Sequence, residues 1–213
     1  MTFHDFKALP LKKKWEHLWE YYRWPVLVVL LVALFMGSWI HGALQQKDPI
    51  LQVEMINAYS KAPDGEAFQE FLEQQGIEYY PEAVLVGKNI QMSGPDATAN
   101  YGAAQMLMCS LSAGEPDLIF WDLPEILPML NGGTLMDLRE LLPPERMEQF
   151  EDQLVYGQLE EDSEPYPCGI YLEKNPWIAD RLYYANCTVS IPVTCKDKPL
   201  AAAFVEYLLS FES

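Results

Sequence analysis

The sequence predicts an α/β domain with one mainly parallel sheet, preceded by a single transmembrane helix. Three observations lead to this prediction. From residue 49 onward, short apolar runs alternate with helical patterns, which is typical of a sheet whose strands are joined by helices. Residues 24–44 contain no Lys, Arg, Asp or Glu. Half of the 213 residues are hydrophobic and 13% are aromatic, so the chain can form a packed core.

The uncharged segment 24–44 has the length of a membrane-spanning helix, since about 20 residues cross a hydrocarbon core roughly 30 Å thick. A run of three lysines that begins at Lys12, together with Arg23, precedes it. By the positive-inside tendency, residues 1–23 stay in the cytoplasm and residues 45–213 form an extracytoplasmic domain. The small residues of a signal-peptidase site are hard to find after the apolar run. We therefore expect an uncleaved, single-pass anchor in a bacterial plasma membrane.

The cytoplasmic part, residues 1–23, is basic and aromatic. Its residues 11–23 could form an amphipathic helix on the membrane surface. The simpler interpretation is an interfacial anchor and topology signal. The alternative is a contact with another membrane protein.

The first half of the outer domain begins with a half-buried strand at residues 51–55, where apolar and polar residues alternate. A Pro-Asp-Gly turn at residues 63–65 then opens a helix, and Gly76 is placed to end it. A second extended region is expected at residues 83–86. Residues 93–114 read as a turn followed by a helix rich in alanine, methionine and leucine.

The second half begins with residues 118–120, which are apolar at consecutive positions, as expected of a strand covered on both faces. Asp122, followed three residues later by Glu125, predicts the start of a helix over residues 123–130. The remaining predicted elements are a helix that begins near Pro143, short extended pieces within residues 166–191, and a final helix that begins near Asp197.

The outer domain is strongly acidic and contains no histidine. From residue 45 onward there are nine basic and 28 acidic residues, a net charge of −19. Such a surface repels nucleic acid and anionic lipid, so nucleic acid is not an expected partner. All three histidines, His4, His17 and His41, precede the domain, which argues against histidine-based catalysis and histidine-containing zinc sites. We therefore expect that the chain is not an enzyme and that it binds neither a cofactor nor a metal ion.

Four cysteines lie in the outer domain: Cys109, Cys168, Cys187 and Cys195. Disulfides are permitted there if the environment is oxidising. A possible disulfide joins Cys187 to Cys195, but only if the chain between them turns back. As one extended strand, the intervening residues would hold the two cysteines roughly 26 Å apart. Cys109 lies within an apolar helical pattern and is expected to be a buried thiol.

A ligand site, if present, is expected beyond the carboxyl ends of the strands, where open α/β sheets bind their ligands. The simpler interpretation of Asp122 is a helix cap, and that of Trp121 is core packing. The candidate residues follow the expected strands at residues 51–55 and 118–120, precede the alanine-rich helix within residues 93–114, or belong to the segment 166–191. They are Tyr59, Ser60, Ser93, Gly94, Asp96, Trp121, Asp122 and Trp177.

Three segments together resemble the extracellular solute-binding proteins of ABC importers. They are SAGEPDLIFWD, LPMLNGGTLMDLRELLP and SIPVTCKDKPLAAAFVEYLLSF, at residues 112–122, 127–143 and 190–211. Proteins of that family usually have two lobes and a lipid-anchoring cysteine, whereas this chain has room for one lobe and has the apolar segment instead. The resemblance implies a shortened, single-pass relative from Gram-positive bacteria with one periplasmic-binding-protein-like lobe.

This resemblance implies a non-catalytic, membrane-anchored module that binds a small solute. An alternative is a cell-envelope scaffold or protein–protein interaction domain that has lost ligand binding. The expected partners are the lipid bilayer, through residues 24–44, a small solute, and another membrane or envelope protein.

Overall fold

The computed structural model describes two compact units, residues 1–47 and residues 48–213. The described residues are 19, 24–39, 48–57, 60–61, 63–87, 90–92, 97–122, 126–160, 162–184 and 186–211.

In the first unit, residues 24–39 form a helix whose side chains are all exposed. Phe35, for example, is 75% exposed. Within the described ranges, no helix combines the length and the apolar character needed to span a membrane. The expected membrane segment extends to residue 44, and its last five residues, 40–44, lie outside the described ones.

The second unit is built on one six-stranded sheet with the strand order β2-β1-β3-β6-β5-β4. The strands are β1 (Leu51–Met55), β2 (Val84–Val86), β3 (Leu118–Trp121), β4 (Leu154–Gly157), β5 (Tyr166–Glu173) and β6 (Asn186–Ser190). Strand β1 pairs in parallel with both β2 and β3. The pairs β3–β6, β6–β5 and β5–β4 are antiparallel.

The sheet is therefore mixed, and the prediction of a mainly parallel sheet is correct only for β2, β1 and β3. The reason lies in the connections. A helix-containing crossover joins β1 to β2, and another joins β2 to β3; crossovers of this kind allow parallel pairing. In contrast, β4 returns directly into β5 across residues 158–165, and a direct return of this kind makes neighbouring strands antiparallel.

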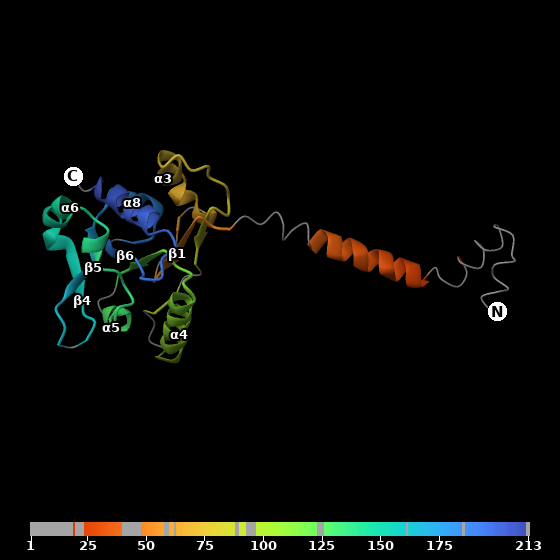
Figure 1. Cartoon of the computed structure of the whole chain (residues 1–213), viewed down its shortest axis with the longest axis horizontal. Helices are drawn as coiled ribbons and strands as arrows, with labels where there is room; N and C mark the ends of the chain where they lie inside the picture. Colours follow the sequence, from red (N-terminus) through yellow and green to blue (C-terminus); the bar gives the residue numbers. More distant parts are fainter. Residues whose placement is uncertain are drawn as a thin grey trace. The chain divides into compact units, whose positions relative to one another are not determined.

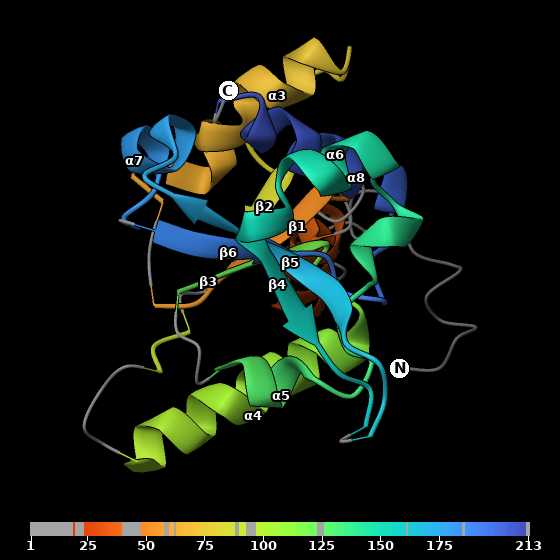
Figure 2. The same cartoon turned by 90° about the vertical axis from the view of Figure 1, so that its left-hand side faces the viewer.

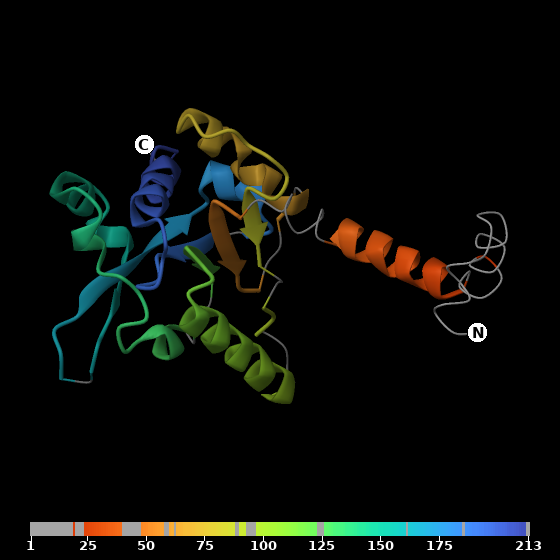
Figure 3. The same ribbon diagram turned by 45° about the vertical axis from the view of Figure 1, so that its right-hand side comes forward.

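Helices cover both faces of the sheet in the second unit (Figures 1 and 2). One face carries α3 (Gln69–Gln74), α6 (Pro144–Gln149), α7 (Pro176–Arg181) and α8 (Lys198–Leu209). The other face carries α4 (Ala97–Ala113) and α5 (Leu127–Leu130), and a view turned by 45° shows the same division (Figure 3). Short 3-10 helices are also present among the described residues, at η1 (Pro63–Phe68), η3 (Leu138–Glu140) and η4 (Glu151–Gln153).

Two cores fill the spaces between these layers, and β3 contributes to both. Its Leu118 and Phe120 belong to the core beneath α3 and α8, whereas Ile119 and Trp121 belong to the core beneath α4. All four side chains are buried, which confirms the prediction of a strand covered on both faces. In the α3–α8 core, aromatic rings pack at centroid separations of 5.4 Å for Phe68–Trp177 and 4.9 Å for Phe71–Phe204.

Several local predictions are confirmed. Residues 51–55 form β1 with the expected alternation of burial. Gly76 follows α3 with a φ of 72°, a conformation that glycine adopts without strain. The Asp197 side chain caps α8 by accepting a hydrogen bond from the amide of Leu200. The helix expected over residues 123–130 is seen as α5 from Leu127, and residues 123–125 lie outside the described ones.

Candidate functional site

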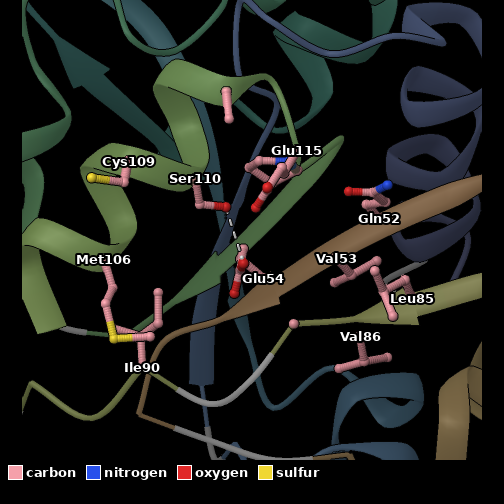
Figure 4. Close-up of a pocket in the computed structure, with 13 residues that line it drawn as sticks. Gln52, Val53, Glu54, Leu85, Val86, Ile90, Met106, Cys109, Ser110 and Glu115 are labelled. Atoms are coloured by element: carbon pink, nitrogen blue, oxygen red, sulfur yellow. Dashed lines mark hydrogen bonds between the residues drawn. The ribbon is translucent and has the colours of Figure 1, made fainter.

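A cavity of about 750 Å³ lies between α4 and the edge of the sheet formed by β1 and β2 (Figure 4). Sites for small molecules typically have volumes of about 300–1,000 Å³. The lining residues come from β1, from β2 and the segment after it, and from α4 and the turn that follows it: Gln52, Val53, Glu54, Leu85, Val86, Gly87, Ile90, Met106, Cys109, Ser110, Ala113, Glu115 and Pro116.

The cavity exists because α4 packs over β3 and leaves the β2 edge of the sheet open. Leu107 and Leu111 of α4 are buried together with Ile119 and Trp121 of β3. Farther out, Leu85 of β2 lines the cavity and remains 53% exposed. A helix lies over only part of this face, so the neighbouring part is hollow.

The alternation of side chains along β1 places a carboxylate in this cavity. The apolar residues of β1, at positions 51, 53 and 55, belong to the core on the opposite face. Because successive side chains of a strand point to opposite faces, Gln52 and Glu54 face α4. Figure 4 shows Glu54 of β1 and Ser110 of α4 pointing toward each other. The Ser110 hydroxyl donates a hydrogen bond of 3.2 Å to Glu54 Oε1.

The other carboxylate oxygen, Glu54 Oε2, is buried without a hydrogen-bond partner among the described residues. Burial is the largest influence on this group and raises the pKa of the Glu54 carboxyl. The hydrogen bond from Ser110 lowers this pKa in part, and the nearby charge of Glu115 raises it further. A buried carboxylate with one unpaired oxygen is disfavoured in its charged form, so it can be stabilised by a proton or by a cation.

Gly87 leaves the space that the Glu54 carboxylate occupies. A Cβ atom at this position would lie 2.2 Å from Glu54 Oε2, which is closer than any allowed contact. The Gly87 amide donates a hydrogen bond of 2.7 Å to the carbonyl oxygen of Val53, and this bond holds the end of β2 against β1. The carboxylate is therefore held between the backbone after β2 on one side and α4 on the other.

The remaining wall of the cavity is mostly apolar. It includes Leu85, Ile90, Met106 and Ala113. Methionine is flexible and adapts to differently shaped apolar groups. The cavity thus combines an apolar container with one partly buried carboxylate and one hydroxyl, an arrangement that can bind a ligand.

Cys109 lies on the exposed side of α4, so the prediction of a buried thiol was wrong. The helix has no charged residue from Ala97 to Ala113, and both its buried and its exposed side chains are largely apolar. Composition therefore could not show which face of this helix is buried.

The structure places two of the sequence-predicted ligand residues in the cores. Trp121 is 3% exposed, and its indole Nε1 donates a hydrogen bond of 3.1 Å to Ser190 Oγ. Trp177 is 1% exposed and lies in the core on the opposite face of the sheet. These two side chains are not brought together. Neither is among the residues that line the cavity beside α4.

Among the other predicted residues, Asp122 accepts a hydrogen bond of 3.3 Å from Asn57 Nδ2. Ser60 forms an isolated bridge with Leu182. The rest of the predicted ligand residues lie outside the described ones: Tyr59, Ser93, Gly94 and Asp96.

Side chains of the protein form hydrogen bonds with the backbone at the described part of the carboxyl ends of β1 and β3. Asn57, which has a positive φ of 62°, accepts a hydrogen bond of 2.6 Å from the Met92 amide. The buried Tyr184 hydroxyl donates to the carbonyl oxygens of Ile56 and Phe120, and burial raises the pKa of this phenol. Ligand binding at the strand ends stays a prediction.

None of the four cysteines takes part in a disulfide, so the possible disulfide between Cys187 and Cys195 is not formed in the structure. Cys187 lies within the extended strand β6, as the single-strand interpretation predicts, and Cys195 follows beyond a turn. Burial raises the pKa of the Cys168 thiol to about 11 and that of Cys195 to about 12. Within the part of the chain that the structure describes, no group of three or more histidine, cysteine, aspartate or glutamate side chains could hold a metal ion.

Sequence reasoning missed Glu54 and Gly87. The alternation in β1 marks Glu54 as facing away from the α3–α8 core, but the same pattern fits a glutamate in solvent. The burial of Glu54 depends on where α4 packs against the sheet, and no local sequence pattern indicates that position.

Comparisons with protein-family models, with curated proteins and with solved structures returned no match. The resemblance to solute-binding proteins therefore rests on the three sequence segments alone.

Proposed function

We propose that this chain is a membrane-anchored, extracytoplasmic binding module that holds a small solute and performs no catalysis. The cavity beside Glu54 is the observation that carries this proposal. Its volume of about 750 Å³ fits a small molecule, its wall is mostly apolar, and the Glu54 carboxylate can orient a ligand.

The proposed membrane anchor is the apolar helical segment of the first unit. The described helix, residues 24–39, exposes apolar side chains on every side, which water disfavours and a hydrocarbon environment accepts. The uncharged sequence continues to residue 44, a length suited to a bilayer core. The basic residues before it favour a cytoplasmic N-terminus and an outward-facing domain, as expected for a single-pass protein of a Gram-positive plasma membrane.

We also propose, from the three sequence segments, that the second unit corresponds to one lobe of a solute-binding protein. The α/β architecture with helices on both faces of the sheet is compatible with this relationship. The cavity lies beside the edge strand and not at the strand ends. A solute would therefore bind in a place that differs from the cleft that two lobes form in that family.

A second candidate function, a scaffold or protein–protein interaction domain, is favoured by the exposed side of α4. This side is free of charge, and it exposes Tyr101 at 65% and Met106 at 58%. Aromatic residues and methionine are enriched in protein interfaces, whereas charged residues are depleted from their centres.

Thermal unfolding of the full chain in mild detergent, measured against a library of sugars, peptides, amino acids and amines, tests the proposed function. A solute present at about 100 times its dissociation constant stabilises the protein by about 2.7 kcal/mol, which raises the unfolding midpoint. A response to no member of the library would reject the solute-binding proposal. In that case, association of the chain with itself or with an envelope protein is measured next. Loss of this association in Tyr101→Lys would support the protein–protein interaction domain.

A further inference from the structure

We propose that the cavity beside Glu54 takes a small organic cation: an ammonium group carried on an apolar body. This inference rests on the proposed binding function and specifies the chemical class of its ligand.

The charges of the cavity favour a cation. Glu54 and Glu115 are both acidic, and none of the described lining residues is basic. Glu115 is exposed at the margin, whereas Glu54 lies deeper, between β1 and α4. An anionic ligand would meet two like charges and, among the described lining residues, no basic side chain. The net charge of −19 from residue 45 onward adds a long-range attraction for cations.

Glu54 also has unused hydrogen-bonding capacity. Its Oε1 accepts one bond from Ser110, and its Oε2 accepts none from the described residues. A carboxylate can accept about four hydrogen bonds, and an ammonium group offers up to three donors. Paired with an ammonium, the carboxylate would exchange an unsatisfied buried oxygen for a charge-assisted hydrogen bond. The raised pKa of Glu54 agrees with this view, because its largest cause is burial, and burial disfavours a charged carboxylate without an ion-pair partner.

The walls select for an apolar body on the cation. Leu85, Ile90 and Met106 surround the space next to Glu54 (Figure 4). A metal cation such as Ca²⁺ would need six to eight oxygen ligands, far more than a carboxylate and a serine hydroxyl supply. An alkyl or arylalkyl amine satisfies both halves of the cavity, since its ammonium group pairs with Glu54 and its carbon body covers the apolar wall.

Three molecules with the same body test this inference: phenylbutylamine, phenylbutanol and phenylbutyrate. The full chain in mild detergent is titrated with each one, and the thermal unfolding midpoint gives the dissociation constant. The amine is expected to bind at least about tenfold more tightly than the alcohol, because a hydrogen bond to a charged group contributes about 1.5–3 kcal/mol. The carboxylate is expected to bind more weakly than either.

Variants then assign the ammonium group to Glu54. Glu54→Gln is expected to weaken amine binding about tenfold or more and to leave alcohol binding unchanged. The matched control is Glu148→Gln, an exposed glutamate of α6, which should bind like the parent. Both variants are measured in the same detergent, so partitioning of the amine into micelles cancels. If Glu54→Gln does not fold, Leu85→Lys places a positive charge at an exposed wall position and should selectively weaken amine binding.

Equal binding of the amine and the alcohol, with no effect of Glu54→Gln, would overturn the cation inference and leave the solute-binding proposal standing. The cation inference also fails if a library solute binds and the amine does not. If neither the library nor this series binds, both proposals fail.

Lys88 directly follows Gly87 in the sequence and lies outside the described residues. A loss of amine binding in Lys88→Gln as large as in Glu54→Gln would contradict the assignment, since removing a cation cannot weaken charge pairing with an amine.

Discussion

Glu54 is a partly buried carboxyl group whose pKa is raised above its ordinary value of 4.5, mainly by burial. The folded protein therefore holds the proton of Glu54 more tightly than the unfolded chain does. The stability that this proton provides is fully present below about pH 4.5 and is lost as the pH rises through the raised pKa of the folded state. Glutamine resembles the protonated glutamate and does not ionise. We expect Glu54→Gln to match the parent at low pH and to be the more stable protein at neutral pH.

Urea unfolding of both proteins across this pH range measures the difference. Other titrating groups are common to the two proteins, so they cancel in the comparison. Parallel stability curves over the whole range would show that Glu54 does not titrate with a raised pKa.

Asp117 is a buried carboxylate that joins two distant parts of the chain. It is 2% exposed, and its two oxygens accept hydrogen bonds of 2.9 Å from the amides of Gln52 and Lys196. Asp117→Ala would leave two partly buried amide groups unpaired. Because each unpaired group costs about 1–3 kcal/mol, we expect the free energy of unfolding to fall by about 2–6 kcal/mol.

Equilibrium urea unfolding checks this value, with Asp122→Ala as the control. The Asp122 side chain makes a longer hydrogen bond to Asn57 at an exposed position, so the control should change stability by less than about 1 kcal/mol. Equal effects of the two substitutions would mean that Asp117 does not tie the two segments together.

At the scale of elements, the sequence predicts structure wherever one local pattern decides it. The alternation in β1 and the consecutive apolar residues of β3 follow from which faces of the sheet are covered. The start of α8 follows from the cap at Asp197. The direction of β6 relative to β3 does not follow from such a pattern, because it depends on pairing between residues about 70 positions apart, such as Phe120 with Val189.

Gly169 lies in β5, where a side chain would meet the neighbouring strand β6. A Cβ atom there would lie 2.6 Å from Ser190 Oγ and 2.7 Å from Thr188 Cγ2. These atoms belong to a packed strand, and Ser190 Oγ also accepts the hydrogen bond from Trp121. We expect Gly169→Ala to force β5 and β6 apart locally and to destabilise the protein by about 1–3 kcal/mol.

Gly102 of α4 provides the opposite case, since nothing lies within 4 Å of a Cβ atom placed there. Alanine is the better helix former, so Gly102→Ala is expected to stabilise the protein by roughly 0.5–1 kcal/mol. Thermal unfolding of both variants shows whether each substitution raises or lowers the stability of the protein. A Gly169→Ala protein as stable as the parent would show that the contact between β5 and β6 is looser than the structure indicates.

At the scale of the whole molecule, the general rule about strand ends did not lead to the cavity. The rule selected residues at the carboxyl ends of β1 and β3, where the structure buries Trp121 and places the Tyr184 hydroxyl against the carbonyl oxygens of Ile56 and Phe120. The cavity arises where α4 leaves the β2 edge uncovered. This position is set by the packing of Leu107 and Leu111 against β3, which only the three-dimensional arrangement reveals.

The four thiols provide a test of the proposed extracytoplasmic location of the second unit. Cys109 is exposed, and the other three cysteines are buried. Burial raises the pKa of Cys168 to about 11 and that of Cys195 to about 12, so these two carry little of the reactive thiolate near neutral pH. If the unit is extracytoplasmic, a membrane-impermeant maleimide added to intact cells should modify one cysteine per chain, and Cys109→Ser should remove this modification. Mass spectrometry of the purified chain counts the labels, and all four thiols should react after unfolding in urea. Modification of Cys109 only after the cells are lysed would place the unit in the cytoplasm and would overturn the proposed topology, because the reagent reaches an exposed thiol on the outer side without lysis.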